Sequence, residues 1–391
     1  MAKVGFFPHI QSQTPLRHVA LLRHTRSKFG VLSAMTDGLR SAFERAGIRA
    51  SVIDSIDADT LGEAVRQLAP DCTFGVNISV SEQLLFYPIH IPHVTLFVDT
   101  VVHYTPSVFD RPPSIVLMVD QQSEGLFRSL GGKRGHWFPH AIAQETLDRA
   151  VAEEPIPLED RPYDICLPGS YLDPRRPMEN LNIDPVKKSL FQDLVQRALS
   201  DFSIPFFTEW FYAADRMGLD PFVVGVALES VLRGIDRERL IRSLSKREVT
   251  IFTSDEDAVL WKKTNPTCRF HPQVDFRGIF DLCCRSKVVI NSAPHIRPGY
   301  HERLFLSLAA GAITVTERGR LPQWVVDRGR VVEYDTASLD TLADRVREAE
   351  KRPYDREAVL KWLANEHTWD ARLQKMRPAI EQDIQEIVAS V

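Results

Sequence analysis

The sequence predicts an α/β protein made of two doubly wound domains that face a cleft. Short, continuously apolar segments alternate with segments of helical periodicity in the first 140 residues, and the alternation resumes from residue 163. Between the two series lies an acidic segment, residues 141–162, which ends in a cluster of prolines. Alternation of this kind is typical of parallel sheets with crossover helices. Two such series joined by a proline-containing linker indicate two Rossmann-like domains.

In the first series, each expected strand is short and apolar throughout, as is usual for strands that are covered on both faces. The expected strands are residues 18–23, 50–53, 72–76, 94–98 and 115–119. Helical periodicity marks residues 31–46, which stop at Gly47, and residues 60–68, which are closed by Pro70. We expect the first domain to comprise residues 1–145.

The second series predicts another parallel sheet in residues 160–365. The expected strands are residues 163–167, 249–253, 287–291 and 312–316, and the expected helices are residues 184–199, 255–263, 276–284, 301–310 and 338–350. Residues 203–245 are strongly helical and rich in aromatic residues, which indicates a helical insertion in this domain. Residues 354–391 form two or three further helices, and we expect the last, about residues 370–391, to return to the first domain.

Composition narrows the class of protein. Of the 391 residues, 44% are hydrophobic, and 48 basic against 52 acidic residues give a net charge of −4. This balance lacks the basic excess of a duplex nucleic-acid binder. No apolar run approaches the 18–20 residues, roughly, that span a bilayer, and the N-terminal residues lack the apolar core of a signal peptide. Five cysteines without a CxxC pair argue against a disulfide framework and a structural zinc site, so we expect a cytoplasmic protein.

Several catalytic signatures are absent from the sequence. It contains no GxxxxGK[ST] and no GxGxxG after its first strand, so neither a P-loop nor a standard nicotinamide or flavin site is expected. It also lacks GxSxG and HExxH. The acidic triplet Asp255-Glu256-Asp257 stands at a helix start, where it compensates the helix dipole more naturally than it binds a metal ion.

The most informative stretch is residues 291–317, NSAPHIRPGYHERLFLSLAAGAITVTE. A strand ends at Asn291, a loop follows, and His301-Glu302-Arg303 opens a helix that ends in small residues. Backbone amides at a helix start bind phosphate, and an adjacent arginine adds a bidentate partner. A carboxylate there accepts hydrogen bonds from ribose hydroxyls. Alternatively, Glu302 only caps the helix and Arg303 is solvated.

This stretch resembles the nucleotide-binding half of the GT-B glycosyltransferases. Three other stretches resemble the CgeB-like (spore-maturation-protein-like) members of that superfamily. These are RPYDICLPGSYLDP at 161–174, the paired strand ends LFVDT at 96–100 and IVLMVD at 115–120, and HWFPH at 136–140. The order and spacing of the four stretches hold over about residues 17–370.

The resemblance implies transfer of a sugar from a nucleotide donor without a metal ion or other cofactor. The donor would lie against the second domain and the acceptor against the first. Many retaining relatives carry a Glu-x7-Glu pair, and alignment of the small-residue turn places Leu306 at the second glutamate. Glu302 lies one helical turn earlier on the same face and is the candidate substitute. The resemblance therefore does not predict whether the transferred sugar keeps or inverts its anomeric configuration.

The resemblance and the positions of residues at strand ends together predict the site residues. Asp99 is the candidate general base, Asp120 is its rival at a neighbouring strand end, and His140 stands at the domain junction. The residues expected to bind the donor are Gly169, Ser170, Tyr171, Ser292, Gly299, His301, Glu302 and Arg303. A basic loop after the first strand is expected to hold a phosphate or an acidic acceptor, or to be an ordinary surface loop; its residues are Arg23, Arg26 and Lys28.

Three functions fit the sequence. The first is a glycosyltransferase that uses a nucleotide sugar and acts on a protein, a polysaccharide or a small metabolite. The second is an epimerase or hydrolase of nucleotide sugars with the same fold, which would turn over the donor without an acceptor. The third is a non-catalytic module that binds a sugar or a partner protein. The Glu302-Arg303 pair beside a glycine-containing loop weighs against the third.

Overall fold

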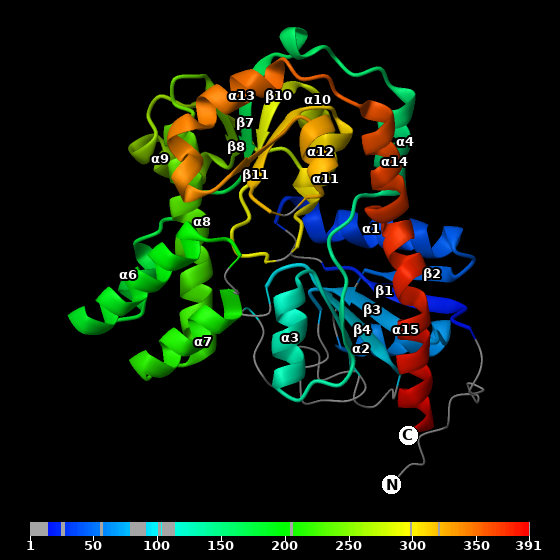
Figure 1. Ribbon diagram of the computed structural model, residues 1–391. Coiled ribbons are helices and arrows are strands. Elements are labelled where there is room, and N and C mark those ends of the chain that lie inside the picture. Colours follow the sequence, from blue (N-terminus) through cyan, green and yellow to red (C-terminus); the bar gives the residue numbers. More distant parts are fainter. Residues whose placement is uncertain are drawn as a thin grey trace.

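The computed structural model describes residues 15–24, 28–54, 58–78, 91–100, 103, 114–203, 206–297, 299–319 and 321–390. It contains two six-stranded sheets, and every strand pair in them is parallel. Helices flank both sheets, and the sheets lie one above the other in Figure 1. The predicted α/β architecture of two doubly wound domains is confirmed.

The first sheet has the strand order β2-β1-β3-β4-β5-β6. Its strands are β1 His18–Leu22, β2 Arg49–Ile53, β3 Cys72–Val76, β4 His93–Phe97, β5 Ser114–Met118 and β6 Gly135–Trp137. The connecting helices are α1 Val31–Arg45, α2 Ala58–Leu68 and α3 Gln121–Ser129. β1, β3 and β4 are buried along their whole length, which explains why their sequences are apolar without alternation.

The second sheet has the strand order β12-β11-β10-β7-β8-β9. Its strands are β7 Tyr163–Pro168, β8 Val249–Thr253, β9 Arg269–Pro272, β10 Ser286–Ile290, β11 Ile313–Glu317 and β12 Val331–Tyr334. The helices around it are α9 Asp255–Thr264, α10 Ile279–Cys284, α11 Glu302–Ala309, α12 Gln323–Arg328 and α13 Leu342–Glu350. Sequence patterning missed β9 and β12, the two edge strands. β9 reads RFHP, which is too short and too polar to stand out as a strand.

A helical insertion separates β7 from β8. It consists of α5 Arg176–Asn180, α6 Pro185–Ser200, α7 Phe206–Met217 and α8 Pro221–Ser243, and its helices extend to one side of the molecule (Figure 1). Trp210 and Phe191 lie in a hydrophobic cluster of its own, which also takes in Leu126 of α3. Part of the aromatic content noticed in the sequence therefore serves packing within the insertion.

The chain passes between the two sheets twice, at neighbouring places. After β6 it runs through α4 Gln144–Ala152 into β7, and it returns through α14 Arg356–Glu366 into α15 Trp369–Ala389. The two passages pair as a short parallel bridge between Ile142 and Thr368. The amide of Ile142 donates to the carbonyl of His367 at 2.9 Å, and the amide of Trp369 donates to the carbonyl of Ile142 at 3.1 Å.

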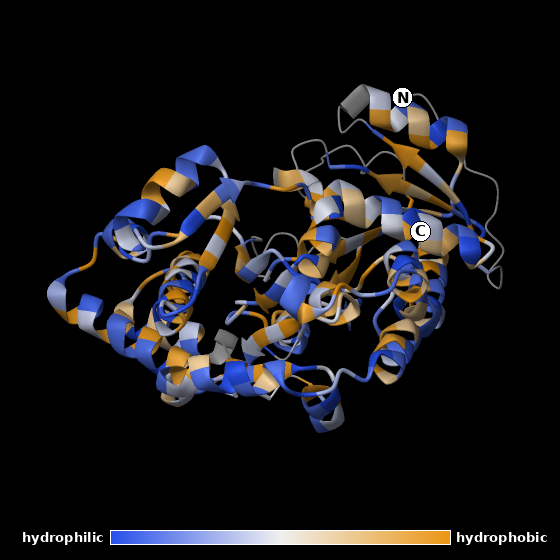
Figure 2. Cartoon of the chain, turned by 90° about the horizontal axis from the view of Figure 1, so that it is seen from above, coloured by the Kyte–Doolittle hydropathy of each residue, from blue (hydrophilic) through white to orange (hydrophobic). Residues whose placement is uncertain are grey.

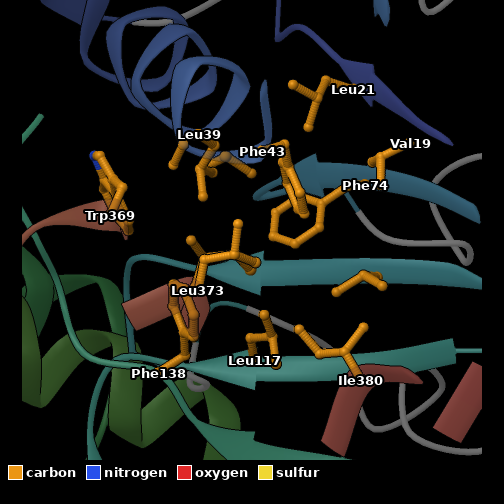
Figure 3. Packing of buried hydrophobic residues seen from close by; sticks show 14 of the residues in the cluster. Val19, Leu21, Leu39, Phe43, Phe74, Leu117, Phe138, Trp369, Leu373 and Ile380 are labelled. Atoms are coloured by element: carbon orange, nitrogen blue, oxygen red, sulfur yellow. The ribbon is translucent and has the colours of Figure 1, made fainter. Parts of the chain in front are cut away.

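Helix α15 contributes to the hydrophobic core beside the first sheet. Trp369, Leu373 and Ile380 belong to the same buried cluster as Phe43 and Phe74, and their side chains point towards α1 and the strands in Figure 3. Around this core the polar residues lie mainly on the outer helices, while the strands are largely apolar (Figure 2). Within the described residues, no helix is long and apolar enough to cross a membrane.

Candidate active site

A cavity of about 380 Å³ lies between the two sheets. The first domain lines it with residues that follow β3 and β4, among them Asn77 and Asp99. The second domain lines it with residues at the ends of β7, β8 and β9, and with the start of α11. These are carboxyl ends of parallel strands, where open α/β sheets bind their ligands. The cavity is therefore the candidate active site.

The start of α11 places three predicted residues at the cavity: His301, Glu302 and Arg303. His301 is the N-cap, and its ring accepts a hydrogen bond from the amide of Arg303 at 3.4 Å. Glu302 is 5% exposed, and its Oε2 atom lies 3.1 Å from Nδ1 of His140 and 3.3 Å from Nδ1 of His301. Burial, together with the positive charge of Arg303, holds the pKa of His301 well below its usual range. A carboxylate thus faces two imidazoles at this wall.

Leu306, one turn further along α11, also lines the cavity. The position that the resemblance to retaining GT-B enzymes aligns with a glutamate is therefore an apolar part of the wall here. Glu302 lies on the same face of the helix but is turned towards His140, which precedes the linker.

Asp99 follows β4 and lines the cavity from the first domain. The Nδ2 group of Asn77 donates to its Oδ2 at 2.8 Å, and Oδ1 of Asn77 accepts from the amide of Val98 at 2.9 Å. Asn77 has a positive φ of 54°, a conformation that asparagine tolerates better than most residues. One amide side chain therefore fixes both the strand end and the carboxylate.

Helix α8 of the insertion contributes two arginines that sequence reasoning missed. Arg233 and Arg237 line the cavity together with Gly169 and Ser170, which follow β7. Nη1 of Arg237 donates to the carbonyl of Ser170 at 2.6 Å. A side chain at Gly169 would begin 3.5 Å from the Arg237 guanidinium carbon. Burial, reinforced by the charges of Arg233 and Arg303, holds the pKa of Arg237 well below its usual value.

Glu229, on the same face of α8, connects the insertion to the first domain. It is 1% exposed, accepts from Thr100 Oγ1, and lies 2.9 Å from Nε2 of His103 and 2.9 Å from Nη1 of Arg233. The regular spacing of residues 229, 233 and 237 was the available signal. Helical spacing alone, however, does not show which surface a helix face meets.

Four of the residues predicted to be catalytic or to bind the donor lie outside the cavity lining. Asp120 is buried as the N-cap of α3 and accepts from the amide and hydroxyl of Ser123; burial raises its pKa to about 6, although these bonds oppose the rise. Ser292 donates to Asp236 Oδ2 at 2.6 Å, and Gly299 forms an antiparallel bridge with Asp120. Tyr171 packs edge-on against Trp261 in the core of the second domain.

Of the basic residues predicted after β1, the structure describes the side chain of Arg23. Arg23 pairs with Asp37 and, at 3.0 Å, with Asp54, so carboxylates of the first domain already hold its guanidinium. It does not line the cavity. Arg26 and the side chain of Lys28 lie outside the described residues. In the described part of the chain, no cluster of three or more His, Cys, Asp or Glu side chains is placed to hold a metal ion.

Residues 236–377 match the glycosyl transferase-like family. The matched segment begins in α8 and ends in α15, so it covers most of the second domain. No curated protein matches the sequence significantly.

Solved glycosyltransferases share the fold. An α-glucosyltransferase in complex with UDP and a 13-mer DNA containing an HMU base has a TM-score of 0.58 at 9% identity, over 94% of this chain and 100% of that one. AviGT4, a glycosyltransferase of avilamycin A biosynthesis, has a TM-score of 0.50 at 12% identity, over 96% and 99%. The fold is that of the GT-B glycosyltransferases.

Proposed function

We propose that the protein transfers a glycosyl group from a nucleotide-sugar donor to a hydroxyl group or another nucleophile of an acceptor. The observation that carries the proposal is the division of the cavity between two domains, with Asp99 on one side and Glu302 and Arg303 on the other. A diphosphate leaving group needs cationic partners, and an acceptor hydroxyl needs a base.

The second domain is the proposed donor side. The family match falls on this domain, and a solved structure with the same fold contains UDP. Arg303 would hold the phosphate groups, and Glu302 would accept hydrogen bonds from donor hydroxyls beside His140. The resemblance of three sequence stretches to the CgeB-like enzymes makes that subgroup part of the proposal.

The first domain is the proposed acceptor side. Asp99 would take the proton from the acceptor nucleophile as that atom bonds to the anomeric carbon, while the bond from this carbon to the diphosphate oxygen breaks. Asn77 orients the carboxylate through its 2.8 Å hydrogen bond. We propose that the negative charge of the leaving diphosphate is compensated by arginine and backbone amides rather than by a metal ion, and that the enzyme works in the cytoplasm.

A ligand panel followed by a turnover assay tests the proposal. At a hundred times its dissociation constant, a nucleotide sugar should stabilise the protein by about 2.7 kcal/mol, which a thermal melt detects. The stabilising donor is then incubated with serine- and threonine-containing peptides, oligosaccharides and small alcohols, and release of nucleoside diphosphate is followed. Acceptor-dependent release supports transfer. Release without any acceptor would indicate a hydrolase, and no stabilisation by any nucleotide sugar would refute the proposed donor class.

A further inference from the structure

The insertion reaches the cavity through one face of α8. Residues 229, 233 and 237 are four apart, so their side chains lie along one side of the helix. Glu229 contacts the first domain through Thr100 and His103, whereas Arg233 and Arg237 line the cavity. The 23-residue helix is therefore part of the wall of the candidate active site and not only a support for α6 and α7.

The guanidinium groups at this wall have few partners. Arg237 is 4% exposed, and within the described residues its side chain makes one hydrogen bond, to the carbonyl of Ser170. No hydrogen bond of the Arg303 side chain is found among the described residues. In that same part of the chain, neither arginine has a carboxylate oxygen within 4.0 Å. Arg233 is paired with Glu229.

Such an arrangement is costly without a ligand. Burial and then the like charges of Arg233 and Arg303 lower the pKa of Arg237, and the charges of Asp236 and Asp257 oppose this only in part. Burial also lowers the pKa of Arg303, although the charge of Glu302 opposes this. Buried charges are normally paired or satisfied by a ligand. Glu302 lies nearby, but its Oε2 atom faces the rings of His140 and His301. An anion inside the cavity would supply the missing partner for Arg237 and Arg303.

We propose that Arg233 and Arg237 of the insertion, together with Arg303 of α11, bind the diphosphate group of the ligand. Planar guanidinium groups match phosphate oxygens in bidentate geometry. The absence of a side chain at Gly169 leaves space beside the Arg237 guanidinium, where a Cβ atom would stand 3.5 Å from its central carbon. This inference rests on the proposed function for the identity of the ligand, but the assignment of α8 to the site does not.

The test uses inorganic pyrophosphate as the probe and the full chain as the protein. Isothermal titration calorimetry compares wild type with Arg237→Gln, Arg233→Gln and the matched control Arg242→Gln, an exposed arginine on the same helix. Loss of one charge-assisted bond should weaken pyrophosphate binding about ten- to a hundredfold in the first two variants. The control should bind as tightly as wild type.

Folding of each variant is checked by circular dichroism and thermal melting. If Arg237→Gln does not fold, Arg237→Lys and the more exposed Arg233→Gln decide the question. Unchanged pyrophosphate affinity in the folded variants would overturn the inference, and so would a wild-type protein that does not bind pyrophosphate. If the variants lose pyrophosphate while wild type turns over no nucleotide sugar, the site stands and the proposed reaction fails. If the variants turn over a nucleotide sugar with unchanged KM, the reaction stands and this site fails.

Discussion

Replacement of Glu229 by glutamine tests the link between the insertion and the first domain. The Glu229 carboxylate is buried, accepts a hydrogen bond from Thr100, and lies within 2.9 Å of both His103 and Arg233. Nε2 of His295 lies 3.7 Å from Oε1 of the same carboxylate. Glutamine keeps the size of the side chain but removes its charge and one acceptor oxygen, so its neighbours lose their common counter-ion.

The expected loss follows from the burial of these groups. Removal of one partner from a buried ion pair costs about 3–5 kcal/mol. The side chains of Arg233 and His103 are 28% and 36% exposed, so water compensates in part. We therefore expect about 3 kcal/mol, at the low end of that range. For a domain of this size, this corresponds to a fall in Tm of roughly 6–12 °C.

The effect should depend on pH. Burial lowers the pKa of His103, but the hydrogen bond and charge of Glu229 outweigh it and raise that pKa above its usual value of 6.5. A raised pKa in the folded state contributes stability that is complete below 6.5 and is lost as pH rises through the raised value. Glu229 itself stays ionised, since its pKa is held well below 4.5, against burial, by His295, His103 and Arg233. The difference in Tm should be larger at about pH 6 than at about pH 8.5.

Thermal melts of wild type, Glu229→Gln and a control at both pH values decide the matter. Glu348→Gln is a suitable control, because this glutamate is exposed on α13. A Glu229→Gln Tm within about 2 °C of wild type would refute the reasoning, since it would mean a loss well below 1.5 kcal/mol. If the difference in Tm between wild type and Glu229→Gln does not shrink at high pH, His103 does not contribute to the stabilisation by Glu229.

Four further expectations concern the site and the core. Asp99→Asn should lower turnover at least about a hundredfold with donor affinity unchanged, and near-normal turnover would exclude it as the base. Glu302→Ala and Arg303→Ala should each weaken donor binding roughly ten- to over a hundredfold by calorimetry, and unchanged affinity in both would place the donor elsewhere. Activity should survive EDTA, whereas loss on chelation with rescue by manganese or magnesium would demand a metal site. Trp369 is buried, and its ring stacks on Phe138 with centroids 6.1 Å apart. Trp369→Ala should therefore lower the free energy of unfolding by about 3–5 kcal/mol, measured as a lower Tm. An unchanged Tm would show that α15 does not stabilise this core.

The sequence predicted the features that depend on local pattern. Strands such as β3 and β4 are buried on both faces and are therefore apolar throughout, which short-range inspection detects. Asp99 and Glu302 stand at a strand end and a helix start, so topology alone brings them to the edge where the sheets meet. β9 could not be found in this way, because an edge strand of four residues need not be apolar.

The sequence pattern could not predict the direction in which side chains point. Asp120 also ends a strand, but its carboxylate turns back to cap α3 through Ser123. Arg237 is far from Gly169 in the sequence, and only the packing of the insertion against the second sheet brings them together. Periodicity shows that a helix has a face but does not show which surface that face meets.

The place of α15 in the core has a consequence for how the protein is made. Synthesis proceeds from the N-terminus, so β1 to β6 leave the ribosome long before residues 369–389. Until then Phe43 and Phe74 lack Trp369, Leu373 and Ile380, and their shared core is open on one side. The second sheet, whose strands lie between residues 163 and 334, can assemble before α15 is available to complete the core of the first domain. We therefore expect the first domain, although it is translated first, to reach its native state last. Until then its exposed apolar surface would be a binding site for chaperones.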